Sequence, residues 1–338
     1  MISDKLNNTE LKEKELINYY SSEEKIKILS ERMAKIFNFD LIGLKYIERG
    51  GGSFIYLADI KERKNSLIVK VINEEKCKNL REVTIMSQLR HKNIISMYGY
   101  YFAKNSELFI LMERGKMDLK NFPIKLLKRA VLSESFLCFT AYQILEGLKY
   151  LYKCKIIHYD IKPNNIVIDD MLNVKIIDFS TSVGISQIKE PYIKLKYRGT
   201  SFYMAPEVIK RQEIEIKNFH KIDLFSLGVT LYRLAFGCYP FDLKREDMDN
   251  DDIIYNKINS DWKVKNEETE FSNYFIDFLN CLLEKDINKR INIDEAMNHY
   301  WVQGGKILFE EKENISNANI FLTSLITDHF LTFNKYLN

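Results

Sequence analysis

The feature that most constrains the fold is a change of pattern about one third of the way along the 338-residue chain. Residues 41–60 have the pattern of a strand, a glycine turn and a second strand. Short apolar stretches at 66–72 and 108–112 predict two further strands, and residues 74–89 predict a helix with Leu80, Val83 and Met86 along one face.

After about residue 118 the pattern is mostly helical, as at 135–152 and 219–235, with two short apolar strands at 166–168 and 174–177. A β-rich first third followed by a helical remainder indicates an α+β protein with two lobes and a cleft between them.

The ends of the chain read as extensions of this body. Ser21 and Glu24 have capping-box spacing, and they precede apolar residues at helical period, namely Ile26, Leu29, Met33, Ile36 and Phe37. We expect a helix that packs on the domain, and a helix that binds a partner or regulates the domain is the alternative. Residues 308–319 are charged and rich in Asn, which predicts a linker, and 320–338 predict a short amphipathic tail.

Composition excludes several classes of protein. The chain is 46% hydrophobic and 29% charged with a net charge of +3, so no polyanion partner is indicated. The five cysteines show no CxxC spacing, which disfavours a disulfide framework or a zinc site. No apolar run reaches the ~18 residues of a membrane span. We therefore expect an intracellular protein, cytoplasmic or nuclear, with no membrane or nucleic-acid partner, and the oligomeric state stays open.

Two weak signals for phosphate binding lie in the β-rich part. Gly50, Gly51 and Gly52 stand between two strands, where glycines let backbone N–H groups approach phosphate oxygens, although such a run is more often only a hairpin turn. Lys70 lies within an apolar strand, and Glu82 on the next helix can pair with it. Each residue on its own is equally compatible with a solvated surface position.

The strong signal is a loop that carries Asp160, Lys162 and Asn165, with Asp178 eighteen residues after Asp160. Asp160 can orient a hydroxyl and accept its proton, and Lys162 can offset charge on a phosphoryl group. Asn165 and Asp178 offer the hard oxygen ligands that Mg²⁺ prefers. These residue types in this order predict phosphoryl transfer to a hydroxyl.

Residues 41–301 resemble the eukaryotic-type protein kinase family. Gly50, Gly52 and Phe54 match its glycine-rich loop, and Lys70, Glu82, Asp160, Asn165 and Asp178 match its catalytic set. The stretch 199–207 and the Asp223 region match its activation-segment end and its buried central helix, and Arg290 matches the arginine that pairs with Glu207.

The resemblance implies an ATP- and Mg²⁺-dependent serine/threonine kinase with a protein substrate. Asp160 and Lys162 are then catalytic, Asn165 and Asp178 bind metal, and Thr200, Glu207, Asp223 and Arg290 are structural or regulatory. The ATP-binding residues that the resemblance implies are Ile47, Gly50, Gly52, Ser53, Phe54, Leu57, Ile68, Lys70, Glu82, Met112, Glu113, Gly115 and Asp118. Met112 is expected as the gatekeeper, with an N-lobe over 41–112, a hinge over 113–117, a C-lobe over 118–303 and extensions at 1–40 and 304–338.

The chain departs from the family pattern at several positions. Tyr159 replaces the arginine that normally binds an activation-loop phosphate, and Lys196 lies near the usual phosphorylation site, so we expect activity that does not need that phosphorylation. Ser180 replaces a glycine, Ile55 replaces the third loop glycine, and Ile68 replaces an alanine. These changes motivate the alternative of a pseudokinase scaffold. A small-molecule kinase of the antibiotic phosphotransferase type is disfavoured, because the 199–207 segment, Asp223 and Arg290 are all present.

Overall fold

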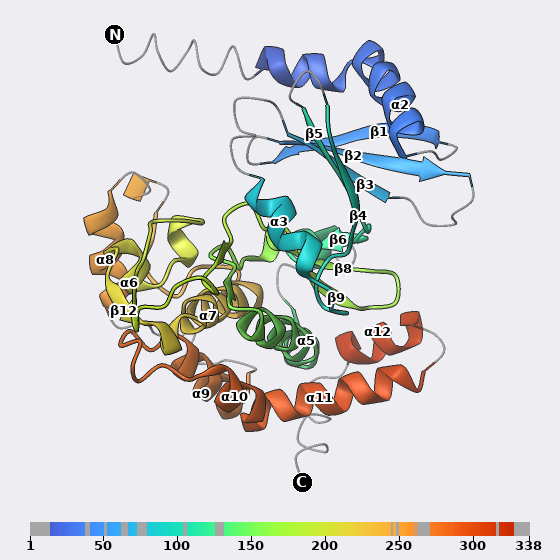
Figure 1. Cartoon of the computed structure of the whole chain (residues 1–338). Coiled ribbons are helices and arrows are strands. Elements are labelled where there is room, and N and C mark those ends of the chain that lie inside the picture. The colour runs from blue at the N-terminus through green and yellow to red at the C-terminus, as the bar shows by residue number, and fades with distance from the viewer. Residues whose placement is uncertain are drawn as a thin grey trace. The chain divides into compact units, whose positions relative to one another are not determined.

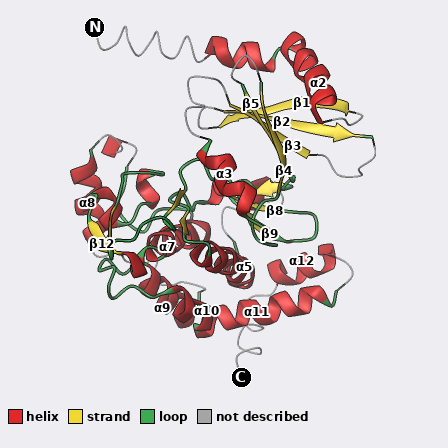
Figure 2. Ribbon diagram, in the orientation of Figure 1, coloured by secondary structure: helices red, strands yellow, loops and turns green. Residues whose placement is uncertain are grey.

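The computed structural model describes residues 14–37, 41–50, 53–61, 67–72, 80–103, 107–125, 132–244, 246–247, 250–260, 262, 271–315 and 318–327. The chain divides into two compact units. The sheet unit comprises Met1–Gln88 with Ile95–Arg114, and the helical unit comprises Leu89–Ile94 with Gly115–Asn338. A sheet-rich first unit and a mainly helical second unit confirm the predicted α+β class with two lobes (Figures 1 and 2).

The described strands of the sheet unit form one antiparallel sheet in the order β1-β2-β3-β5-β4. They are β1 (Leu41–Gly50), β2 (Ser53–Ile60), β3 (Leu67–Ile72), β4 (Met97–Phe102) and β5 (Leu108–Met112). The strands expected within 41–60, 66–72 and 108–112 are therefore confirmed. Strand β4 was not predicted, because Tyr98, Tyr100, Tyr101 and Phe102 are all exposed and show no alternation of burial.

The two faces of this sheet have different roles. Phe54, Tyr56 and Ala58 alternate along β2 on the face that also carries Val69 and Val71 of β3, and all five are buried in one core cluster. Because successive residues of a strand point to opposite faces, Ile55 and its cross-strand partner Lys70 lie on the other face.

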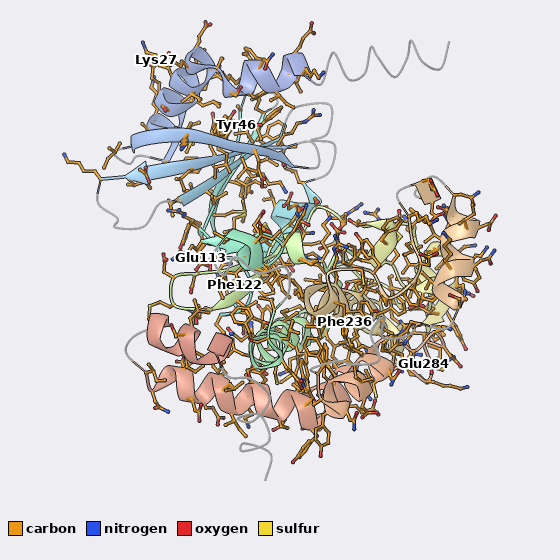
Figure 3. The ribbon with its side chains drawn as sticks, turned by 180° about the vertical axis from the view of Figure 1, so that it is seen from behind. Lys27, Tyr46, Glu113, Phe122, Phe236 and Glu284 are labelled. Atoms are coloured by element: carbon orange, nitrogen blue, oxygen red, sulfur yellow. The ribbon has the colours of Figure 1, made fainter. Side chains whose placement is uncertain are left out.

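The N-terminal helices cover the first of these faces. Residues 14–21 are helical, and α2 (Glu23–Phe37) follows, with Leu29 and Met33 fully buried against the sheet (Figure 1). In Figure 3 Tyr46 lies on the side of the sheet that α2 covers, and Lys27 projects from the opposite side of α2. The prediction of a helix packed on the domain is confirmed. The capping residue was wrong by one position, because the Ser22 Oγ, not Ser21, accepts the Lys25 N–H at 3.2 Å.

The helix α3 (Arg81–Gln88) is the described part of the helix expected over 74–89, and residues 74–79 lie outside the described residues. Val83 and Met86 are buried as predicted. Leu80 is 49% exposed and precedes the helix, so its placement on the buried face was wrong.

Two long helices form the centre of the helical unit. They are α5 (Glu134–Lys153) and α7 (Lys221–Phe236), which confirm the helices expected at 135–152 and 219–235, and most of their residues are buried. Figure 3 shows Phe122 and Phe236 within the dense side-chain packing of this unit. Its other described elements are β6 (Met117–Asp118), α4 (Phe122–Lys125), β7 (Ile156–Ile157), β8 (Ile166–Ile168), β9 (Val174–Ile176), β10 (Val183–Gly184), β11 (Tyr192–Lys194), α6 (Pro206–Ile209), β12 (Glu213–Glu215), α8 (Asp251–Asn259), α9 (Asn273–Leu282) and α10 (Ile293–Asn298).

The C-terminal segment is helical where a linker was expected. Helix α11 (Tyr300–Glu313) continues through residues 308–313, because Leu308, Phe309 and Lys312 are buried against the rest of the unit. The predicted boundary between 303 and 304 therefore falls inside a helix. Helix α12 (Ala318–Thr327) follows and packs on α5, and residues 328–338 lie outside the described residues (Figure 1).

Candidate active site

The sheet unit holds a buried ion pair. Lys70 Nζ lies 2.7 Å from Glu82 Oε1 and 3.0 Å from Oε2, and the two residues are 7% and 6% exposed. Strand β3 supplies the lysine and the first turn of α3 supplies the glutamate. A lysine in an apolar strand is costly if it faces inward alone, and this pairing resolves that cost. The structure thus brings together two residues that the sequence connected only through the family pattern.

The register of the sheet gathers most of the expected nucleotide-binding side chains on the Lys70 face. Ile68 pairs with both Leu57 and Met112, and these positions share the face of Lys70. Ser53, which lies opposite Ile72, belongs to the same face. One face of β2, β3 and β5 therefore presents a lysine surrounded by apolar side chains.

Four expected nucleotide contacts stand differently. Phe54 departs from the expectation, because its ring is buried in the core on the face opposite Lys70. Ile47 lies at a bulge of β1 and is 47% exposed. Gly50 is the last residue of β1 and pairs with Ser53, whereas Gly52 lies outside the described residues.

The expected hinge is fixed by backbone contacts in each unit. In the sheet unit, the Glu113 N–H donates to the Ser96 carbonyl at 2.9 Å. In the helical unit, a Cβ on Gly115 would lie 2.4 Å from Val167 Cγ2, so only glycine fits there. The Asp118 carboxylate accepts two hydrogen bonds from Asn121, at 2.9 and 2.7 Å, and its expected contact with ribose stays a prediction.

In the helical unit, Asp160 is the centre of a hydrogen-bonded network. The Thr200 Oγ1 donates to Asp160 Oδ1 at 2.7 Å, and Lys162 Nζ lies 2.7 Å from Oδ2. Lys162 also donates to Thr200 Oγ1 at 2.6 Å. Asn165 Nδ2 lies 2.8 Å from both Asp160 Oδ2 and the Asp160 carbonyl. A carboxylate held at both oxygens in this way is fixed in orientation before any substrate arrives.

Asp223 holds the loop from beneath. Its two carboxylate oxygens accept the backbone N–H groups of His158 at 2.8 Å and Tyr159 at 2.9 Å. Burial raises the pKa of Asp223, and the nearby His158 side chain and these two N–H groups oppose the rise. Tyr159 takes a left-handed conformation with φ of 69°, which the two backbone contacts hold in place.

His158 orients the next residue. Its Nδ1 accepts the Asp160 N–H at 3.2 Å, so the proton lies on Nε2, which donates to the Ile177 carbonyl at 3.0 Å. The His158 ring also meets the Phe179 ring edge to face with a centroid separation of 5.0 Å. The imidazole therefore joins the Asp160 loop to the segment that carries Asp178.

Asn165 and Asp178 fit the chemistry of a magnesium site. The amide nitrogen of Asn165 is engaged by Asp160, so its oxygen is the atom that remains to face a cation. Asp178 is half-buried and has φ of 64° in the turn after β9. An amide oxygen and a carboxylate are the hard donors that Mg²⁺ selects.

Gly199 allows the activation segment to approach the catalytic loop. It has φ of 97°, and a Cβ at this position would lie 2.0 Å from the Tyr159 carbonyl. Only glycine meets both conditions. Gly199 thereby delivers Thr200 to Asp160, a role that the family pattern indicated for Thr200 but that sequence reasoning did not extend to Gly199.

A second buried ion pair anchors the far end of the same segment. Arg290 Nη1 and Nη2 meet the two oxygens of Glu207 at 2.7 and 3.1 Å, and the side chains are 0% and 2% exposed. Arg290 Nε also donates to the Glu284 carbonyl at 2.7 Å. This bidentate pair fixes α6 in the helical unit.

Tyr159 fills the place of the missing arginine with an apolar contact. Its ring is 5% exposed and belongs to the core cluster that contains Leu195, and its hydroxyl accepts a hydrogen bond from the Lys196 backbone N–H. Burial and the Asp223 charge raise the pKa of Tyr159 to about 12. The sequence showed that the arginine is absent but not what Tyr159 does in its place.

Comparison with known proteins agrees with this geometry. Residues 41–302 match the model of the protein kinase domain. The chain is 31% identical over 281 residues to an Aurora kinase of Schizosaccharomyces pombe, an alignment that covers 79% of this chain and 73% of the relative. It is 30% identical over 250 residues to death-associated protein kinase 2 of Homo sapiens, covering 72% of this chain and 63% of that protein. It is also 30% identical over 271 residues to serine/threonine-protein kinase CLA4 of Candida albicans, covering 77% of this chain but only 26% of that relative.

These relatives disfavour the pseudokinase alternative, and they confirm the family resemblance found in the sequence. In the part of the chain that the structure describes, no helix combines the length and the apolarity that crossing a membrane requires. Because the kinase domain model matches more than half of its length, the chain belongs to the protein kinase family, among its serine/threonine members.

Proposed function

We propose that this chain transfers the γ-phosphoryl group of Mg-ATP to a serine or threonine hydroxyl of a protein substrate, with Asp160 as the catalytic base. The observation that carries the proposal is the fixed Asp160 carboxylate, which Thr200, Lys162 and Asn165 contact together at 2.7–2.8 Å. A group held in this way is suited to aligning a hydroxyl, which is the main task in phosphoryl transfer.

In the proposed reaction the substrate oxygen forms a bond to the γ-phosphorus while the bond to the β-phosphate bridging oxygen breaks. The hydroxyl proton moves to Asp160, and ADP is the leaving group. Lys162 lies 2.7 Å from Asp160 and supplies positive charge where the transferred phosphoryl group gains negative charge. A bound Mg²⁺, held by Asn165 and Asp178, would neutralise phosphate charge. Lys70, oriented by Glu82, would contact phosphate oxygens from the sheet unit.

The test compares the wild type with Asp160→Asn in Mg-ATP with casein or myelin basic protein as acceptor. Asparagine keeps the shape but cannot accept the proton, so we expect kcat to fall by about 10²–10⁴-fold with little change in ATP binding. Phosphoserine or phosphothreonine formed only by the wild type supports the proposal. Bound Mg-ATP with no transfer by the wild type, across several acceptors and with Mn²⁺ also tried, would contradict it.

The same site supports activity without phosphorylation of the activation segment. The buried Tyr159 ring and its hydrogen bond to the Lys196 N–H join the catalytic loop to that segment without any phosphate. We expect protein treated with a phosphatase to keep its kcat within about twofold. Loss of activity after the treatment, restored by a second kinase, would show that the segment needs phosphate after all.

The activation segment also suggests a substrate preference. Lys194 and Lys196 are exposed, and Lys189 and Arg198 add to the positive charge of the segment. We propose that acidic or neutral sequences are preferred over arginine-rich ones, because like charges repel. A peptide array dominated by arginine before the acceptor residue would contradict this preference.

A further inference from the structure

The N-terminal extension contacts the sheet at the glycine turn itself. The ring of Tyr20 stacks on that of Phe54, with centroids 3.7 Å apart and planes 10° from parallel. The two residues are 3% and 1% exposed. Phe54 is the second residue of β2, directly after the turn that joins β1 to β2. The contact therefore fixes the strand that leaves the turn.

The strand that enters the turn joins the same cluster. Arg49 lies opposite Phe54 in the register of β1 and β2, and its guanidinium carbon lies 5.9 Å from the centre of the Phe54 ring. Phe54 thus contacts Tyr20 of the extension and Arg49 of β1. Residues on both sides of the turn are held from the face opposite Lys70.

Tyr20 is itself held rigidly. Its hydroxyl donates to Glu107 Oε1 at 2.9 Å, and its backbone carbonyl accepts the Tyr56 hydroxyl at 2.7 Å. Lys25 of α2 meets the same Glu107 oxygen at 2.7 Å, and both side chains are 4% exposed. Lys25 Nζ also lies 4.7 Å from the Tyr20 ring centre. A ring fixed by one carboxylate, one hydroxyl and one cation can transmit its position to Phe54.

We propose that the N-terminal extension positions the glycine turn for nucleotide binding, and that Tyr20 is the positioning residue. A glycine-rich turn has many accessible conformations, and ordering it around phosphates costs conformational entropy. Anchoring Arg49 and Phe54 beforehand reduces that cost, so the nucleotide binds more tightly to the same groups. The proposal rests on the proposed function in taking Mg-ATP as the nucleotide.

The test measures the Kd for Mg-ATP by calorimetry, together with KM for ATP and kcat, for Tyr20→Leu and Tyr20→Phe. Leucine keeps an apolar side chain in the core but removes the stacked ring. We expect Kd and KM for ATP to rise about three- to tenfold while kcat stays within about twofold. Phenylalanine keeps the ring and loses only the hydrogen bond to Glu107, so its Kd should stay within about twofold of the wild type.

Two further variants separate positioning from general stability. Met33→Ala removes fully buried packing from the same extension, near the end of α2 that leads into Leu41. Leu41 pairs with Ile60, at the end of the hairpin opposite the glycines, so Met33→Ala should lower Tm and leave Kd unchanged. Phe54→Leu should weaken ATP binding as Tyr20→Leu does, and the double variant should show less than the sum of the two effects.

A wild-type Kd in Tyr20→Leu, an effect confined to kcat, or an equal rise of Kd in Met33→Ala would each overturn the proposal. All are measured well below the Tm of each variant, so partial unfolding does not enter. A wild type that binds no Mg-ATP would overturn the proposed function together with this inference. A wild type that binds Mg-ATP, with Tyr20→Leu unchanged, would overturn this inference alone.

Discussion

The Lys70–Glu82 pair of the sheet unit and the Asp160 network of the helical unit are both buried and charged, but they are built differently. The pair joins one side chain of strand β3 to one side chain of helix α3. The Asp160 carboxylate instead accepts hydrogen bonds from three side chains, and the backbone around it is held by Asp223 and His158.

This difference teaches where each site is vulnerable. A two-residue pair depends on the placement of one helix, and loss of either partner leaves a buried charge. A network with several donors keeps its geometry when one donor is lost, but it requires the backbone path that brings the donors together. The predictions below test this contrast, from the largest expected effect to the smallest.

The backbone path of the network is most exposed to damage at Gly199. Gly199→Ala places a Cβ 2.0 Å from the Tyr159 carbonyl at a φ of 97°, so the segment must shift. A shift of about 1 Å at Thr200 and Asp160 should lower kcat/KM by about a hundredfold or more.

Gly184→Ala is the matched control for this change. A Cβ at Gly184, in β10, meets no atom within 4 Å, so its kcat/KM and Tm should match those of the wild type. Unchanged activity in Gly199→Ala would show that the close approach of the two segments is not needed.

The pair of the sheet unit should respond in both stability and activity. Lys70→Met leaves the Glu82 carboxylate buried without its cation, so the free energy of unfolding should fall by about 3 kcal/mol. Loss of a charged contact to phosphate should lower kcat/KM by about 10- to 100-fold.

Adding Glu82→Leu to Lys70→Met separates the two effects. Removing the stranded carboxylate should restore most of the unfolding free energy in urea, while kcat/KM stays low. Recovery of activity along with stability would mean that Lys70 serves only the fold.

Removing one donor of the network should have a smaller effect. Thr200→Val deletes the hydroxyl that bridges Asp160 and Lys162, but the Lys162 and Asn165 contacts to Asp160 remain. We expect kcat to fall about fivefold. Thr200→Ser keeps the hydroxyl and should retain wild-type kcat, and a loss in Thr200→Val as large as that of Asp160→Asn would contradict the idea of redundant support.

Acid should separate the two units at a still finer level. The sheet unit contains no histidine, whereas His220 in the helical unit is buried, and burial followed by the Lys221 charge lowers the pKa of His220 to about 4. The unfolded chain therefore binds a proton near pH 6.5 that the folded chain refuses, so stability falls as pH drops from about 6.5 towards 4.

We expect this residue to cost about 1 kcal/mol of unfolding free energy between pH 7 and pH 5.5. His220→Phe keeps the ring beside Tyr152, 4.4 Å away between centroids, and should flatten that part of the pH profile without changing activity at pH 7. Parallel profiles for the two proteins in urea denaturation would show that His220 titrates normally.

Much of the candidate site could be predicted from the sequence because its residues lie in short, ordered motifs. Asp160, Lys162 and Asn165 occupy one loop of six residues, so their proximity follows from chain connectivity alone. Lys70 with Glu82, and Glu207 with Arg290, are distant in sequence. Only the family pattern connected them before the structure placed them in contact.

The sequence could not predict the departures that depend on packing. The stretch at 308–319 is charged and reads as a linker, yet Leu308 and Phe309 are buried and keep α11 helical through Glu313. Lys25 reads as a surface residue of an amphipathic helix, yet it is buried against Glu107. In both cases the partner lies far away in the chain.

The sequence by itself determined the family, the α+β class and the catalytic residues, because these follow from local patterns and from motifs in a fixed order. The tertiary structure alone decided that Phe54 faces Tyr20 and not the Lys70 side of the sheet, and that Tyr159 takes the place of an arginine in joining two segments. The physical reason is the same for both. Strand register and burial set which face a side chain occupies, and neither is fixed until distant segments pack together.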